Sequence, residues 1–116
     1  MATVLGSPVL LHHPSPFDWA YLAGVIDGEG SILIRDRSVR VRVVNTNYEL
    51  VHWIAQHFRG AVYTEQRDHP RKRSYTWVLA AREPVRELLR EVRPWLIVKA
   101  DRADQALELI KEIQAA

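Results

Sequence analysis

The segment Leu22-Ala23-Gly24-Val25-Ile26-Asp27-Gly28-Glu29-Gly30 is an apolar run that ends on two carboxylates set among glycines. The last carbonyl groups of a helix carry partial negative charge and disfavour acidic side chains. In a helix, Ala20, Gly24 and Gly28 would share one face and form a small-residue strip that another backbone can approach. If that backbone belongs to a second copy, two-fold symmetry brings two Glu29 side chains together, and a cation is needed to offset their repulsion.

This segment resembles the signature helix of the LAGLIDADG homing endonucleases. Six positions match the family name directly, namely Leu22, Ala23, Gly24, Ile26, Asp27 and Gly30, whereas Val25, Gly28 and Glu29 are substitutions that the family commonly accepts. The alternative is a buried helix with a glycine-rich C-terminal cap, because Asp-Gly-Glu-Gly also suits a turn.

Length and composition are those of one globular domain: 116 residues, of which 47% are hydrophobic and 26% charged. There is no cysteine, which excludes disulfides and cysteine-based zinc sites, and the five histidines lack ligand spacing. No apolar run approaches the roughly 20 residues of a membrane span, and the start of the chain lacks the positive residues of a secretory signal. We therefore expect an intracellular protein without a membrane partner. Residues 1–16 are predicted to be a flexible tail and residues 17–116 a single domain.

Positive charge is concentrated in the middle of the chain. Residues 31–82 contain nine arginines and one lysine against four acids, although the whole chain has a net charge of only +2. Residues 1–30 and 83–116 are net acidic. A basic region is compatible with simple solubility as well as with an anionic partner, so its arrangement must decide.

Hydrophobic residues alternate with polar ones in this basic region, which predicts strands. We expect one hairpin of 31–37 and 39–45, joined at Ser38, and a second of 61–67 and 74–80. The four strands would share a polar, arginine-rich face. Such an antiparallel sheet suits base edges and phosphates in the major groove of DNA, whereas a merely solvated sheet would more usually mix lysine with glutamate.

Capping signals place helices around the hairpins. Asp18 is predicted to cap the first helix, a capping box at residues 46–49 to open the second and Pro84 to start the third, with a last helix beginning near Asp101. The predicted class is α+β with a four-stranded antiparallel sheet, in the order αββαββα followed by a final helix. This is the plan of the LAGLIDADG domain.

The resemblance implies a divalent-metal-dependent DNA endonuclease. Glu29 occupies the family's metal-binding acidic position, and the Gly28 carbonyl is a second candidate ligand for Mg²⁺ or Mn²⁺. Asn45 falls where the family places a polar residue that organises the attacking water, with Thr46 as a substitute. Lys99 falls where it places a cation near the phosphate. The implied catalytic residues are therefore Glu29, Asn45 and Lys99.

The resemblance also implies the partners. A chain with one signature helix is expected to form a homodimer on a near-palindromic double-stranded DNA site, with Ala20, Gly24, Asp27 and Gly28 at the interface. The family's sheet positions, projected onto this pattern, give the DNA contacts Arg35, Arg37, Arg40, Arg42, Tyr63, Glu65, Arg67 and Thr76, with Arg71, Lys72 and Arg73 on backbone phosphates.

Two other functions stay open. A DNA-binding regulator could keep the fold and lose cleavage, but such a protein would normally have replaced the acidic residue at Glu29. An intron RNA maturase would bind RNA through another surface, yet residues 83–116 are nearly neutral. Cleavage of DNA is therefore the preferred hypothesis.

Overall fold

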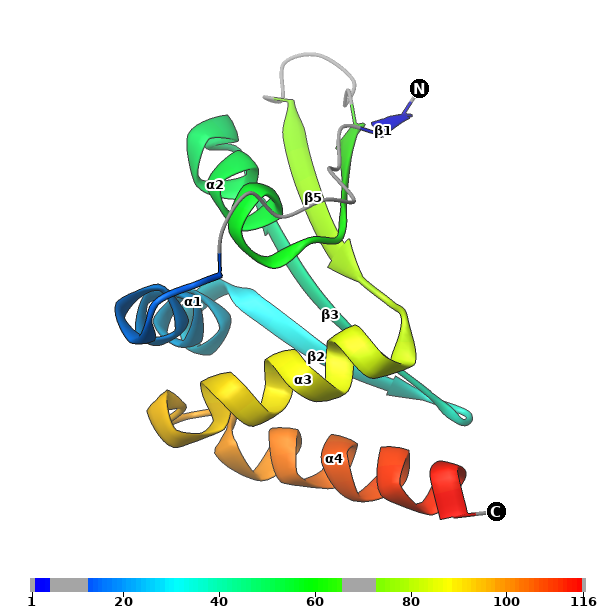
Figure 1. The fold of residues 1–116 in the computed structure, drawn as a ribbon. Coiled ribbons are helices and arrows are strands. Elements are labelled where there is room, and N and C mark those ends of the chain that lie inside the picture. The colour runs from blue at the N-terminus through cyan, green and yellow to red at the C-terminus, as the bar shows by residue number, and fades with distance from the viewer. Residues whose placement is uncertain (1, 5–12, 66–72, 116) are drawn as a thin grey trace.

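The computed structural model describes residues 2–4, 13–65 and 73–115 (Figure 1). Its helices are α1 (Pro16–Glu29), α2 (Tyr48–Phe58), α3 (Arg82–Val92) and α4 (Ala100–Ala115), with a 3₁₀ turn at Arg93–Trp95; its strands are β1 (Ala2–Val4), β2 (Gly30–Arg35), β3 (Ser38–Asn45), β4 (Ala61–Glu65) and β5 (Ser74–Leu79). The α+β class and the predicted order of helices and hairpins are confirmed. Within the described ranges, no helix is both long and apolar enough to cross a membrane.

The strands form one antiparallel sheet in the order β1-β4-β5-β3-β2. The four predicted strands are all present, and β1 adds a short fifth strand along β4. Residues 2–4 were expected in a flexible tail, and this expectation is wrong for them. Without β1, strand β4 would leave its backbone hydrogen-bonding groups open along that edge of the sheet.

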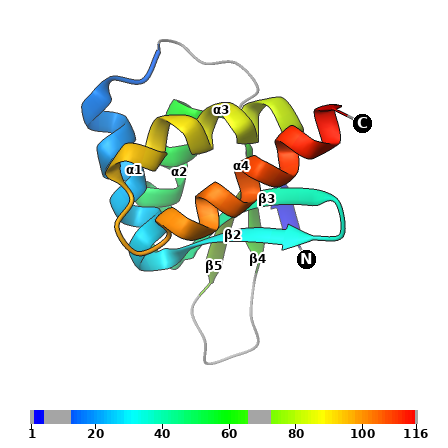
Figure 2. The ribbon, with the colours of Figure 1, turned by 90° about the horizontal axis from the view of Figure 1, so that it is seen from below.

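The two faces of the sheet differ in burial, most clearly on β3. On β3, Val39, Val41 and Val43 are buried, whereas Arg40 and Arg42 between them are exposed. The helices pack against the buried face, with α3 and α4 side by side (Figures 1 and 2). The opposite face, which we call the outer face, has no helix over it in the part of the chain that is described.

Two helix starts differ from prediction by two or three residues. Helix α1 begins at Pro16 with Ser15 as its N-cap, so Asp18 is not the cap. Asp18 is the third helical residue of a capping box: its backbone N–H donates to Ser15 Oγ at 3.2 Å, and its carboxylate accepts from the Ser15 N–H at 2.9 Å. Helix α3 begins at Arg82 rather than Pro84.

The cap of one helix and the position of one turn were also predicted wrongly. Helix α2 is capped by Asn47, whose side chain accepts from the Leu50 N–H at 3.1 Å, and not by a box at Thr46. The β2–β3 turn contains Asp36 and Arg37, because Asp36 has a φ of 55° that reverses the chain there. Arg37 therefore lies in the turn and not in the strand.

The connection from α2 to β4 depends on a glycine. Gly60 has a φ of +89°, and a Cβ built on it would lie 2.4 Å from Trp77 Nε1. That indole nitrogen donates to the Arg59 carbonyl at 2.6 Å, and the Trp77 side chain is fully buried. The turn is thus built around the largest residue of the core.

We predict that Gly60→Ala lowers the free energy of unfolding by about 2 to 4 kcal/mol, since strain at positive φ adds to a clash with Trp77. Urea unfolding followed by tryptophan fluorescence measures the change. Gln56→Ala, at an exposed position of α2, is the control and should leave stability unchanged. Equal stability of Gly60→Ala and the parent protein would show that the turn relaxes without cost.

Candidate functional site

Helix α1 passes into strand β2 without an intervening loop. The Gly30 N–H donates to the carbonyls of Ile26 and Val25, and Gly30 is already the first residue of β2. A Cβ at Gly30 would lie 2.8 Å from Ile26 Cα and 3.3 Å from the Arg42 carbonyl oxygen. Only glycine permits this approach, and the tight junction fixes Glu29 beside the end of β3.

Glu29 and Asn45 meet at this junction. Asn45 is the last residue of β3, and its Nδ2 donates to Glu29 Oε2 at 2.5 Å. Its Oδ1 accepts from the Asn47 N–H at 2.7 Å. Glu29 is exposed, whereas Asn45 is half-buried. Two of the three residues predicted to be catalytic are therefore in contact, although their catalytic roles stay predictions.

The Asp27 carboxylate binds the segment that precedes α4. It accepts from the backbone N–H groups of Ile97 at 2.8 Å, Val98 at 3.1 Å and Lys99 at 2.9 Å. In return, Lys99 Nζ donates to the Asp27 carbonyl oxygen at 2.7 Å. Lys99, the third predicted catalytic residue, is thereby held at the same end of α1 as Glu29.

This arrangement changes the acidity of Asp27. Partial burial raises the pKa of its carboxyl group, but hydrogen bonds from the N–H groups of residues 97–99 and the charge of Lys99 together outweigh burial. The net pKa of Asp27 lies below the ordinary value of 3.8. Asp27 is ionised at neutral pH and acts as a structural clamp that holds the end of α1 to the segment preceding α4.

The small-residue strip is open. A Cβ at Gly24 or at Gly28 would meet nothing within 4 Å. Large apolar side chains are exposed on the same helix and on the segment that Asp27 binds. The exposed fractions are 85% for Phe17 of α1, and 86% for Ile97 and 74% for Val98 of that segment. Sequence reasoning did not identify these three residues, because an apolar segment next to a helix ordinarily predicts burial.

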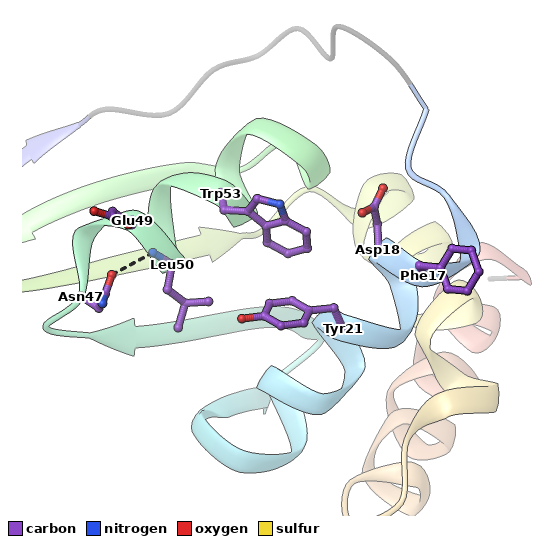
Figure 3. Close-up of a pocket in the computed structure, with 7 residues that line it drawn as sticks. All are labelled: Phe17, Asp18, Tyr21, Asn47, Glu49, Leu50 and Trp53. Atoms are coloured by element: carbon purple, nitrogen blue, oxygen red, sulfur yellow. Dashed lines mark hydrogen bonds between the residues drawn. The ribbon is translucent and has the colours of Figure 1, made fainter.

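A hollow of about 500 Å³ continues this exposed surface between α1 and α2 (Figure 3). Tyr21 and Trp53, which line it, are in edge-to-face contact with ring centroids 4.9 Å apart. The hollow is lined by Phe17, Asp18, Tyr21, Asn47, Glu49, Leu50 and Trp53. Its lining residues from α1 all belong to the first half of that helix.

The outer face carries most of the predicted DNA contacts. The side chains of Arg35, Arg40, Arg42, Tyr63 and Glu65 are exposed on it, and Thr76 is half-buried. Arg37 is exposed in the β2–β3 turn, and Arg73 is exposed just before β5. The predicted contacts Arg67, Arg71 and Lys72 lie outside the described residues.

Within the described ranges no group of three or more His, Asp or Glu side chains could hold a metal ion. One chain thus offers the Glu29 carboxylate and the neighbouring backbone carbonyl of Gly28, and the other ligands of an ion there would have to come from elsewhere. Oxygen donors of this kind suit Mg²⁺, which usually keeps several waters and shares substrate phosphates.

The fold is similar to that of solved homing endonucleases, while no family model and no curated protein sequence matches the chain. An archaeal intron-encoded homing endonuclease, I-Vdi141I, complexed with DNA has a TM-score of 0.68 at 17% identity, over 86% of this chain and 70% of that one. The homing endonuclease I-CvuI, complexed with its target in 2 mM Ca, has a TM-score of 0.65 at 21% identity. A second I-CvuI complex, in 2 mM Mg and with the DNA not cleaved, has a TM-score of 0.64 at 19% identity. Both I-CvuI comparisons cover 84% of this chain and 68% of that one. The chain therefore has the fold that the signature helix suggested.

We predict that Asp27→Asn destabilises the protein by about 1 to 2 kcal/mol at pH 7, since the amide would turn a donor toward a backbone donor. The lowered pKa of Asp27 also fixes the sign of the pH dependence. Its stabilising contribution is complete above the ordinary pKa of 3.8 and is lost as the pH falls through the lower pKa of the folded state. Urea unfolding at a series of pH values from roughly 2 to 7, which includes the range below the ordinary titration of carboxyl groups, measures both effects.

In the Asp27→Asn variant this part of the acid destabilisation should be absent. Glu108→Gln, a change of the same kind at an exposed position of α4, is the matched control and should unfold like the parent protein. Parallel pH profiles for Asp27→Asn and the parent protein would contradict the role of the carboxylate as a clamp.

Proposed function

We propose that this protein is a homodimeric, divalent-metal-dependent endonuclease that makes double-strand breaks at a long, near-palindromic DNA site. The main support is the contact between Glu29 and Asn45. This contact lies where the outer face of the sheet, with its exposed arginines, meets the small-residue strip of α1. Proteins of similar fold were crystallised as homing endonucleases bound to DNA, one of them intron-encoded. We infer intracellular action on DNA, as in the homing of an intron or intein.

The donor set fits a hard cation. Glu29 is exposed, and its described partner is the neutral Asn45 amide, so a cation can bind without first breaking an ion pair. Glu29 and the Gly28 carbonyl would hold Mg²⁺ or Mn²⁺. When bound, such an ion polarises a phosphoryl oxygen and lowers the pKa of a bound water.

The other two residues act from fixed positions. Asn45 is anchored through its Oδ1 to the start of α2 and points its NH₂ group at the junction, where it can orient the water that attacks phosphorus. Lys99 carries a compact charge on a flexible stem and would move from the Asp27 carbonyl to the phosphate. Hydrolysis then breaks the bond from phosphorus to the leaving oxygen and forms one to the water oxygen, with no covalent enzyme intermediate.

A second copy would complete the site along α1. Ala20, Gly24 and Gly28 allow close approach of two helix backbones, and the exposed Phe17 and Ile97 supply apolar surface that water would otherwise cover. Two-fold symmetry brings the two Glu29 side chains near each other, one for each DNA strand. The clamp of Asp27 supports this interface indirectly, because it holds Ile97 in place.

We predict that Glu29→Gln loses Mg²⁺-dependent cleavage by about 100-fold or more and keeps DNA binding, because the amide has the shape of the carboxylate without its charge. Cleavage of a duplex library carrying randomised near-palindromic sites, with sequencing of the ends, measures activity and reveals the target. Glu87→Gln, at an exposed position of α3, is the matched control and should cut like the parent protein.

Equal cutting by Glu29→Gln and the parent protein would contradict the assignment of Glu29 as metal ligand. Selective binding without cutting by either protein would instead identify a non-cleaving DNA-binding regulator. Selective binding of structured RNA, with none of DNA, would favour the maturase hypothesis.

We predict that Gly24→Leu converts the dimer to a monomer that keeps its fold. The space around Gly24 is empty within one chain, so a larger side chain is tolerated there and would separate the two helices. Light scattering gives the mass and circular dichroism the fold. Gln56→Leu, an equally large change at an exposed site on α2, should leave the dimer intact; a dimer of unchanged stability in Gly24→Leu would rule out this interface.

A further inference from the structure

The outer face of the sheet is divided into rows of unlike chemistry. Val44, Thr76 and Tyr63 are paired across β3, β5 and β4, and we call them the neutral row. None of the three is charged, and Val44 and Tyr63 are 38% and 39% exposed. Apolar and hydroxyl groups thus form a continuous uncharged row next to the arginines of the β2–β3 hairpin.

The next rows along the β2–β3 hairpin each carry one arginine. Their register partners are all uncharged: Ser31 and Val78 for Arg42, Leu33 for Arg40, and Ser38 for Arg35. In the part of the chain that the structure describes, no carboxylate pairs with these three guanidinium groups. Their donors are therefore available to a ligand.

The order of the rows is fixed relative to the proposed cleavage site. Val44 directly precedes Asn45, which bonds to Glu29. The hairpin then runs from the end of α1 away to its turn (Figure 1). A ligand lying along this hairpin meets the neutral row first, then Arg42, then Arg40.

The spacing of these rows matches stacked base pairs. A strand rises about 3.3 Å per residue, so Val44, Arg42 and Arg40 follow at about 6.6 Å intervals on one face. Base pairs in DNA stack about 3.4 Å apart. Successive rows therefore step about two base pairs along the groove.

Resting on the proposed function, we propose that each half-site presents thymine to the neutral row and, farther from the cleavage site, guanines about two base pairs apart to Arg42 and Arg40. The guanidinium fork matches the O6 and N7 acceptors of guanine, and apolar side chains contact the thymine methyl group. Arg42 is flanked by a paired strand on each side, with Ser31 of β2 and Val78 of β5 as its register partners, which favours base edges over phosphates. Arg40 follows on the same face of β3, beyond the end of β5, and pairs with Leu33 of β2. Arg73, just before β5, is better placed for the backbone.

Selection of randomised duplex DNA for binding tests this assignment, carried out with Glu29→Gln protein so that the DNA stays intact. The selected half-sites should contain two guanines separated by about one intervening pair. Arg42→Ala should reduce the preference for the guanine nearer to the cleavage site by about 10-fold to 100-fold. Arg40→Ala should reduce the preference for the guanine farther from it by a similar factor. Arg90→Ala, on α3, is the matched control and should select the same sites as the parent background.

Replacing the selected thymine by uracil tests the neutral row, since uracil lacks only the methyl group. The Glu29→Gln protein with Val44 unchanged should bind the uracil duplex about fourfold more weakly than the thymine duplex. In Val44→Ala this difference should shrink or disappear, while the guanine preferences remain.

The outcomes separate this inference from the function on which it rests. If Arg42→Ala weakens binding to all sequences equally and reduces its salt dependence, Arg42 contacts phosphate and the inference is overturned, while site-specific binding still stands. Selected sites without guanine at either position would overturn it too. Absence of any selected sequence would instead remove the proposed function itself.

Discussion

The Asp27 carboxylate is the interaction on which the rest of the arrangement depends. A carboxylate in the last turn of α1 is unfavourable by itself, because the helix end already carries partial negative charge. Here three backbone N–H groups, 70 to 72 residues away in sequence, offset that charge. These groups precede α4, whose first helical bond runs from Ala103 N–H to the Lys99 carbonyl. One side chain thereby joins the end of α1 to the start of α4.

The same clamp explains why apolar side chains are exposed. Since the N–H groups of Ile97 and Val98 turn inward to Asp27, their side chains turn outward, whereas Leu96 just before them is buried. Sequence patterning could not predict this, because four consecutive apolar residues from Trp95 suggest a buried segment. The exposure follows from a contact between segments that only the tertiary fold brings together.

The local sequence pattern was sufficient to predict which side chains of a strand are buried. The alternation of valine and arginine on β3 fixed which side faces the core, because side chains alternate across a strand. Capping was harder to predict, since neighbouring polar residues compete for the same role. Ser15 and Asp18 belong to one capping box. The prediction placed the start of α1 at this box, but it named Asp18 as the N-cap instead of Ser15. Strand β1 carried no periodic signal, because three residues are too few to have one.

Hydrogen bonds determine what the candidate site can offer to a ligand. Asn45 Oδ1 is engaged by the Asn47 N–H, and Asn47 in turn caps α2, so the acceptor side of the Asn45 amide is fixed by the backbone. Only its NH₂ group faces Glu29, which means that Asn45 acts there as a donor. An aspartate at this position would accept where Asn45 donates and would add a second negative charge beside Glu29. Asn45 therefore donates to Glu29 without adding a charge beside it, and whatever water or phosphate oxygen replaces Glu29 as its partner must accept a hydrogen bond.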